Sequence, residues 1–231
     1  MLFRQLQDHK SRTFTYLLAD SGTAEALIID PVREQSGSYL KLLKELGLAL
    51  CGVIDTHTHA DHITGSSRLA EATGCDIIQG RETLAEGVSR KVSDGEQICF
   101  GHHRLLAMST PGHTDDSYCF YFDGSDDRRV FTGDTLLIRG TGRTDFQNGN
   151  PSQQYHSLFN KLLELPEDTA VYPGHDYKGW MVSTIGEEKK HNPRLQVSSA
   201  AEYIELMEHL QLPPPALLKV AVPANLQCGR N

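Results

Sequence analysis

The sequence predicts an α/β fold, a single domain with strands in two sheets and a short helical extension near the C-terminus. Three observations predict it. Short β-type runs and helical patterns are interspersed along the 231 residues, and no low-complexity linker divides them. Apolar residues recur at helical spacing in several segments. Four of the β-type runs end directly at turns that carry histidine or aspartate. We therefore expect one domain over residues 1–231.

The expected strands are rich in apolar, aromatic and β-branched residues and are bounded by turn residues. Ser21-Gly22 separates two of them, which are expected to pair, and Asp94-Gly95 leads into a further hairpin. The strands are expected at residues 14–20, 25–31, 48–54, 75–78, 97–100, 104–108, 118–122, 129–132 and 169–172.

The expected helices follow from apolar residues at spacings of three and four. Tyr39, Leu42, Leu43 and Leu46 share one face, and Gly47 is expected to end that helix. The helices are expected at residues 38–46, 65–73, 151–163 and 198–210, with an extended tail after the proline run 213–215.

Composition limits the partners and the location. The formal net charge of -8 argues against nucleic acid or an anionic membrane as partner, and no apolar run is long enough to cross a bilayer. The first residues lack a secretory or transit pattern, which favours a bacterial cytoplasm, or a mitochondrial location for a processed eukaryotic form. The five scattered cysteines are expected to be reduced, with Cys228 a bystander rather than a redox relay.

One stretch, Asp55-Thr-His-Thr-His-Ala-Asp-His62, concentrates metal-type ligands directly after the apolar run 48–54. His57, His59, Asp61 and His62 lie where a buried strand gives way to a loop. Imidazole nitrogens and a carboxylate suit Zn, Fe or Mn, and the stretch lacks the thiolates of a structural zinc site. The sequence therefore predicts a metal site here.

Three more strand ends carry residues of the same kind: His113, Asp134 and His175. Strand ends at one edge of a sheet lie near each other, so these residues can meet the histidine stretch. The set can form a binuclear site in which His57, His59 and His113 hold one metal, Asp61, His62 and His175 hold a second, and Asp134 bridges them. Such a site activates water for hydrolysis. The spacing does not exclude it.

These motifs together resemble the metallo-β-lactamase superfamily, which implies an αβ/βα sandwich with the metal site at one edge. Within the superfamily the chain is similar to the persulfide dioxygenases over nearly its whole length. A visible departure is Thr141, where family members often carry cysteine. The narrower resemblance rests on residues 59–65, 136–140, 142–147, 175–177, 192–195 and 221–225.

The resemblance implies one Fe(II) per chain, held by His57, His113 and Asp134. Two imidazoles and a carboxylate on one face of iron leave adjacent positions open, as in non-haem oxygenases. His59, Asp61, His62 and His175 would then orient the ligands and tune the metal. The implied reaction is the oxidation of glutathione persulfide by dioxygen to sulfite and glutathione, in sulfide catabolism.

The glycine-rich loop 140–145 lacks the Lys-Ser/Thr ending of a phosphate loop. By resemblance, Arg143 and Asp145 would grip the charged ends of glutathione, and Tyr177 would lie close to the sulfur as a catalytic and substrate-binding residue. The alternative is that Arg143 forms a salt bridge to Asp145 that only shapes the loop. The family also implies a homodimer. A separate rhodanese is the expected functional partner.

Two other functions remain open. A binuclear thioester hydrolase of glyoxalase II type also uses glutathione conjugates, but such enzymes carry a larger basic helical region near the C-terminus. Here that region offers Lys189, Lys190 and Arg194, and the expected helix 198–210 is acidic. A non-catalytic metal-binding or sulfur-trafficking module would require a closed ligand sphere, whereas the implied triad leaves the coordination open.

Overall fold

In the computed structural model, which describes residues 1–124, 127–214 and 217–230, the chain forms two compact units. The first contains Met1–Val92, Gln97–Arg104 and Pro214–Asn231, and the second contains Ser93–Glu96 and Leu105–Pro213. The histidine stretch 57–62 belongs to the first unit, and His113, Asp134 and His175 belong to the second. The single-domain organisation of residues 1–231 stays a prediction.

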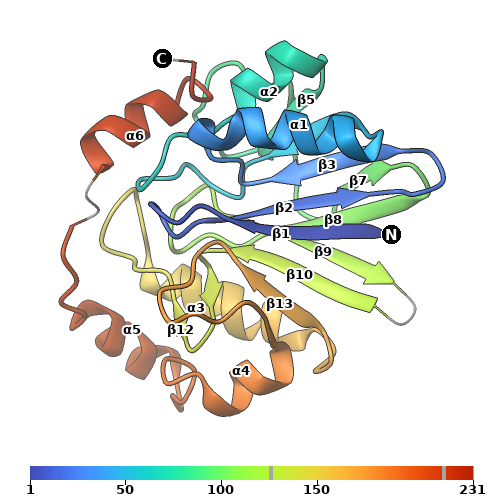
Figure 1. The fold of residues 1–231 in the computed structure, drawn as a ribbon. Helices are drawn as coiled ribbons and strands as arrows, with labels where there is room; N and C mark the ends of the chain where they lie inside the picture. The colour runs from blue at the N-terminus through green and yellow to red at the C-terminus, as the bar shows by residue number, and fades with distance from the viewer. Residues whose placement is uncertain (125–126, 215–216, 231) are drawn as a thin grey trace. The chain divides into compact units, whose positions relative to one another are not determined.

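The first unit is built on a six-stranded sheet in the order β1-β2-β3-β4-β5-β6. The first three strands pair antiparallel, and β3 to β6 pair parallel. Helices α1 and α2 lie along the sheet (Figure 1). Tyr39 and Leu43 of α1 and Leu69 of α2 are buried in one core with residues of its strands. The elements are β1 (Leu2–Gln7), β2 (Phe14–Ala19), β3 (Glu25–Ile29), α1 (Ser36–Leu46), β4 (Ala49–Ile54), α2 (Ser66–Thr73), β5 (Asp76–Gly80), β6 (Arg90–Val92), β7 (Gln97–Phe100) and α6 (Leu218–Asn225).

The second unit is built on a sheet in which β14, β13, β10, β9 and β8 are neighbours in that order. Leu158 of α3 and Tyr203 of α5 are fully buried in its core with Val130 and Val171 of the strands. The elements are β8 (His103–Ser109), β9 (Tyr118–Gly124), β10 (Asp127–Gly133), β11 (Leu136–Leu137), β12 (Gly140–Thr141), α3 (Pro151–Phe159), β13 (Ala170–Pro173), β14 (Ser183–Thr184), α4 (Ile185–His191) and α5 (Ala200–Glu208).

Most expected elements are confirmed with boundaries shifted by a few residues, and two expectations are wrong. The helix expected over 151–163 stops at Phe159, because the backbone leaves the helical region at Lys161 before a short 3-10 turn over Leu162–Glu164. The tail expected to be extended contains α6, whose internal Pro223 lies near its C-terminal end. A proline in that pattern hid the helix from sequence analysis. The third proline of the run 213–215 lies outside the described residues.

The sequence analysis also missed β1 and α4, and the short strands β6, β11, β12 and β14. Within residues 1–124, 127–214 and 217–230, no helix combines the length and the apolar character needed to cross a bilayer.

Candidate active site

The histidine loop, residues 55–65, connects β4 to α2 at the carboxyl edge of the parallel strands. Strands β3 and β4 run parallel and end together, so Asp30 after β3 and Asp55 after β4 lie at the same edge. A backbone bridge between Val32 and Thr64 closes the far end of the loop onto the segment after β3. Parallel strand ends are where α/β proteins place their ligand sites.

Asp30 anchors the start of this loop, although the sequence analysis did not select it. Its side chain is buried, and it accepts hydrogen bonds from the Thr56 amide at 2.7 Å and the Thr56 hydroxyl at 2.9 Å. The same carboxyl lies 3.1 Å from Nε2 of His59. Burial raises the pKa of the Asp30 carboxyl, while His57 opposes that rise. The sequence does offer a signal for Asp30, since it ends a β-type run and is followed directly by a proline.

Thr56 connects Asp30 to His57 by hydrogen bonds. Because its hydroxyl proton is donated to Asp30, the Thr56 oxygen is left to accept from Nδ1 of His57, 3.0 Å away. That hydrogen bond selects the tautomer of His57 in which Nε2 carries the lone pair. His57 is therefore oriented with Nε2 as the nitrogen that can bind a metal.

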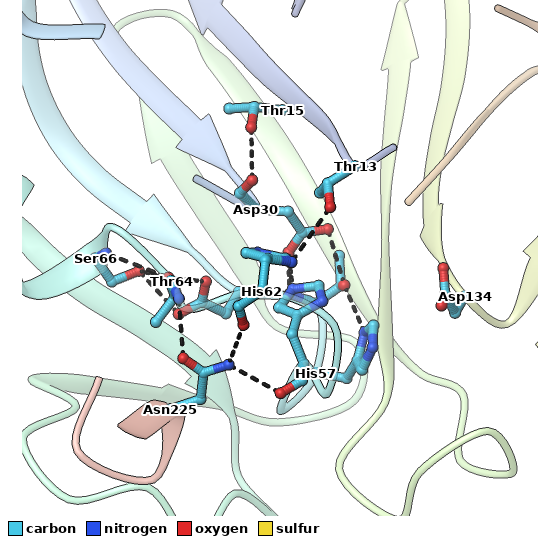
Figure 2. A network of polar contacts seen from close by, with 12 residues as sticks. Thr13, Thr15, Asp30, His57, His62, Thr64, Ser66, Asp134 and Asn225 are labelled. Carbon is cyan, nitrogen blue, oxygen red and sulfur yellow. Dashed lines mark hydrogen bonds and ion pairs between the residues drawn. The ribbon is translucent and has the colours of Figure 1, made fainter. Parts of the chain in front are cut away.

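Asp61 and His62 are held together by Thr13, which precedes β2. The Thr13 hydroxyl donates to Asp61 at 3.2 Å. It also lies 3.2 Å from Nδ1 of His62 (Figure 2). Nδ1 of His62 is also 3.0 Å from the Asp61 carboxylate. The rings of His57 and His59 have centroids 4.1 Å apart, and those of His59 and His62 are 4.3 Å apart. The ligand atoms of His59, Asp61 and His62 lie close enough together to hold one ion.

In the second unit, His113, Asp134 and His175 meet at strand ends. Strands β10 and β13 are parallel neighbours, so Asp134 and His175 follow them at one edge. The two oxygens of Asp134 face different histidines: Oδ1 lies 2.7 Å from Nδ1 of His175, and Oδ2 lies 3.7 Å from Nε2 of His113. Nδ1 of His113 donates to the Arg143 carbonyl at 2.7 Å, which leaves Nε2 as the nitrogen with the lone pair.

Gly142 allows this arrangement because it leaves no room for a side chain. A Cβ atom there would lie 2.2 Å from the Asp134 carbonyl oxygen and 2.7 Å from Nδ1 of His113. The Gly142 amide donates to that same carbonyl at 2.7 Å. On its other side, the buried Gln154 donates to the Gly142 carbonyl, and Tyr203 donates to Gln154. Sequence analysis missed Gln154, which had no motif around it.

Arg143 and Asp145 form a clasp. Two nitrogens of the guanidinium donate to the two oxygens of Asp145 at 2.6 and 2.7 Å, and the remaining contacts are with the carbonyls of Leu212 and Pro213. The group also lies over the Phe146 ring, 4.5 Å from its centroid. The hydrogen bonds from Arg143 lower the pKa of the Asp145 carboxyl. The loop-shaping salt bridge therefore exists, and a role in substrate binding stays a prediction.

The structure also shows the contacts of Tyr177 and Thr141, which the sequence analysis singled out. Tyr177 is largely exposed, and its ring stacks on His175 with centroids 5.9 Å apart and planes only 2° from parallel. Thr141 is buried, and its hydroxyl lies 3.1 Å from an Arg194 nitrogen and 3.3 Å from the Tyr203 hydroxyl. Thr141, where a cysteine was expected from the resemblance, thus makes buried polar contacts with Arg194 and Tyr203.

Each compact unit therefore brings together several of the metal-ligand candidates that the sequence analysis selected. The first brings together His57, His59, Asp61 and His62, and the second brings together His113, Asp134 and His175 with Tyr177 beside them. The arrangement in each unit presents imidazole and carboxylate groups whose tautomers and orientations are set by neighbouring hydrogen bonds. Such groups can hold a transition metal.

Comparison with known proteins gives a consistent result. The model of the metallo-β-lactamase superfamily matches residues 11–175. The mitochondrial persulfide dioxygenase ETHE1 of Homo sapiens is 46% identical over 230 residues, which are 99% of this chain and 89% of that protein. A crystal structure of ETHE1 from Myxococcus xanthus superposes with a TM-score of 0.95 at 50% identity over the full length of both chains. This match confirms the predicted metallo-β-lactamase fold.

A more distant similarity extends to hydrolases. A hydroxyacylglutathione hydrolase of Brucella anthropi is 37% identical over 170 residues, which are 73% of this chain and 63% of that protein.

Proposed function

The chain belongs to the metallo-β-lactamase superfamily and, within it, to the persulfide dioxygenases, and we propose that it oxidises glutathione persulfide with dioxygen. The observation that carries this proposal is the 46% identity to a persulfide dioxygenase over 99% of the chain. In the balanced reaction, glutathione persulfide, dioxygen and water give glutathione, sulfite and two protons. The terminal sulfur is oxidised, the sulfur–sulfur bond breaks, and both atoms of dioxygen are reduced. The process would serve sulfide catabolism.

We propose that one Fe(II) per chain is held by His57, His113 and Asp134. The donor set fits: two imidazoles and one carboxylate form the facial triad of non-haem iron oxygenases. Nε2 of His113 and Oδ2 of Asp134 lie 3.7 Å apart, so one ion could bind both atoms. When bound, Fe(II) supplies the redox chemistry that lets a spin-paired persulfide react with dioxygen.

The chain's other histidines would orient these ligands. His175 donates to Oδ1 of Asp134 and thereby directs Oδ2 toward the His113 side. Asp30 and Thr56 set the tautomer of His57, and the Arg143 carbonyl sets that of His113. His59, Asp61 and His62 would complete the polar surroundings without binding the iron. Hydrogen bonds of this kind fix the orientation and the basicity of metal ligands.

For the substrate, we propose that Arg143 and Asp145 recognise the charged ends of glutathione. The Asp145 carboxylate is about half exposed, at 54%, and can accept from an ammonium group. The guanidinium matches a carboxylate in shape and charge. Tyr177, stacked on His175, would place its hydroxyl near the sulfur, where it could donate a hydrogen bond to the leaving thiolate.

The wider setting is also part of the proposal. We expect a homodimer, working in a bacterial cytoplasm, or in a mitochondrion in a eukaryote, with a separate rhodanese as functional partner. The human relative carries the word mitochondrial in its name. Sedimentation velocity of the purified protein tests the dimer directly.

The rival function is hydrolysis of glutathione thioesters at a two-metal site. The similarity to hydroxyacylglutathione hydrolases and the presence of every binuclear ligand favour it. The cations near the C-terminus do not supply the basic region that such enzymes use: Arg194 bonds Thr141, and Lys189 lies 3.8 Å from Glu167. We therefore rank it second.

One comparison of substrates separates the two functions. Fe(II)-loaded protein and Zn-loaded protein are each given glutathione persulfide and, separately, lactoylglutathione. We expect sulfite from the persulfide with iron, no thioester hydrolysis with either metal, and loss of sulfite production in His113→Ala. Hydrolysis of lactoylglutathione by the Zn-loaded protein, without sulfite from the iron form, would assign the chain to the hydrolases.

A further inference from the structure

Asn225, the last residue of α6, reaches the interior of the histidine loop from the C-terminal segment of the chain. Its amide nitrogen donates to the carbonyl oxygens of His59 at 2.9 Å and His62 at 2.8 Å, and its amide oxygen accepts from the Thr64 amide at 2.9 Å (Figure 2). The side chain is buried, with 3% of its surface exposed. More than 160 residues separate Asn225 from the loop that it bonds.

An amide side chain is suited to this position because it supplies two donors and an acceptor at once. Both donors are used on loop carbonyls, and the acceptor is used on a loop amide. An aspartate of the same shape could still accept from Thr64, but it would turn a carboxylate oxygen toward the carbonyls of His59 and His62. Buried groups left unpaired in this way are costly.

The remainder of the C-terminal segment bonds residues outside the loop. The Leu226 carbonyl accepts from the Glu86 amide, and the Cys228 carbonyl accepts from the Ser67 amide in α2. Gln227 donates to the exposed Glu86 carboxylate at 3.2 Å. These contacts attach the segment to the first unit, whereas Asn225 contacts the backbone of the loop itself.

The two ends of the loop have their own anchors. Asp55 accepts from the hydroxyls of Thr64 and Ser66 at 2.7 and 2.8 Å, and Asp30 accepts from Thr56. Between these ends, Asn225 bonds the backbone carbonyls at His59 and His62. Asn225 therefore holds the loop backbone from His59 to His62. His57, which Thr56 and Asp30 orient, lies two residues before the first of these bonds.

We propose that Asn225 is a positioning residue that fixes the histidine loop for metal binding through His57, which rests on the proposed role of His57 as an iron ligand. The C-terminal helix is thus part of the metal site although it contributes no ligand to it. The fixed loop keeps the imidazole in place before the metal arrives, so less ordering is needed when the ion binds.

Metal-free protein provides the first test, since it reports on the loop without any activity. Amide hydrogen exchange is compared in the wild type, Asn225→Asp, Asn225→Ala and the control Gln227→Ala, which loses a hydrogen bond of the same segment. We expect exchange over residues 58–63 to rise about tenfold or more in both Asn225 variants and to stay unchanged in the control. The Thr64 amide should stay protected in Asn225→Asp and lose protection in Asn225→Ala.

Iron binding provides the second test. We expect the Fe(II) affinity of Asn225→Asp to fall about 10–100-fold, the range seen for groups that support metal ligands. At saturating iron, kcat should fall, and KM for the persulfide should stay within about twofold because the Asn225 side chain bonds the histidine loop and not a residue proposed to bind substrate. The nitrosyl complex of the ferrous protein should show a shifted electron paramagnetic resonance signal in Asn225→Asp and a wild-type signal in Gln227→Ala.

Loop exchange that is unchanged in Asn225→Asp, or raised equally in Gln227→Ala, would overturn the positioning role, as would wild-type iron affinity in Asn225→Asp. A change of exchange confined to residues 218–230 would reduce Asn225 to a tether of the tail and would also overturn it. Failure of the proposed function looks different: the wild type itself would then bind no Fe(II) and consume no dioxygen, while the loop exchange would still respond to Asn225.

Discussion

The Nδ1 atom of His113 lies 2.7 Å from the backbone carbonyl oxygen of Arg143. A histidine proposed to bind the metal is therefore hydrogen-bonded to the loop proposed to bind substrate. The same loop presses Gly142 against the His113 ring and the Asp134 carbonyl. The position of Arg143 and the orientation of His113 are therefore set by one short piece of backbone.

Gly142→Ala should disrupt the backbone segment formed by Gly142 and Arg143. The added Cβ would lie 2.2 Å from the Asp134 carbonyl oxygen, so Asp134 or His113 must move. A displacement near 1 Å at a reacting centre costs about 100-fold in rate, and we expect iron content and dioxygen uptake both to fall at least tenfold. Gly140→Ala is the control, because a Cβ there would meet only Leu137, at 3.9 Å. Equal behaviour of the two variants would contradict this account of Gly142.

The Arg143–Asp145 clasp has a defined pH dependence. The hydrogen bonds from Arg143 lower the pKa of Asp145 in the folded protein, so the clasp contributes stability that is fully present above the unfolded pKa of about 3.9. That contribution is lost as the pH falls through the lowered folded value. Urea unfolding of metal-free wild type and Asp145→Asn should differ by a constant amount from pH 7 to 5, and the difference should shrink below about pH 4. A difference that changes between pH 7 and 5 would contradict the clasp.

Cys228 should be unreactive in the folded protein. Burial raises the pKa of its thiol to about 12, and its Sγ lies 3.3 Å from the Glu86 carbonyl. Thiolates are the reactive form, so a disulfide reagent at pH 8 should modify the exposed Cys99 and leave Cys228 untouched until denaturant is added. Cys228→Ala should keep dioxygen uptake within about twofold. Modification of Cys228 in the native protein would instead point to a relay role.

Arg139 should contribute strongly to stability. It pairs with Glu188, which is fully buried, and its backbone amide also donates to that carboxylate at 2.8 Å. Removing one partner of a buried pair leaves an uncompensated charge, so Arg139→Leu should lower the free energy of unfolding by about 3 kcal/mol. Arg128→Leu, which removes exposed pairs with Asp123 and Asp168, should cost less than about 1 kcal/mol. Chemical denaturation measures both, and similar losses would contradict the prediction.

The sequence predicted the parts of the fold that local patterns encode. The strand before the histidine stretch and helix α1 were found because their apolar residues are continuous or spaced at helical intervals. Helix α6 was missed because Pro223 interrupts its pattern, and the break after Phe159 was missed because apolar residues continue through it.

The candidate site shows the same limit. The histidines and Asp134 were found from motifs, because several ligand types crowd into short stretches. Asp30, Thr13, Gln154 and Asn225 were missed, since each acts through a contact between residues far apart in sequence. Thr13 bonds residues 48 and 49 positions away, and Asn225 bonds residues more than 160 positions away. Only the folded chain shows such contacts.

The central claim is that one Fe(II) per chain supports persulfide oxidation, and a metal titration tests it most directly. Metal-free protein is titrated with Fe(II) in the presence of glutathione persulfide, while dioxygen uptake and sulfite are followed together. We predict that uptake rises linearly, saturates at one iron per chain, and yields one sulfite per dioxygen consumed. Saturation at two irons per chain, or thiol release without dioxygen uptake, would contradict the mononuclear dioxygenase.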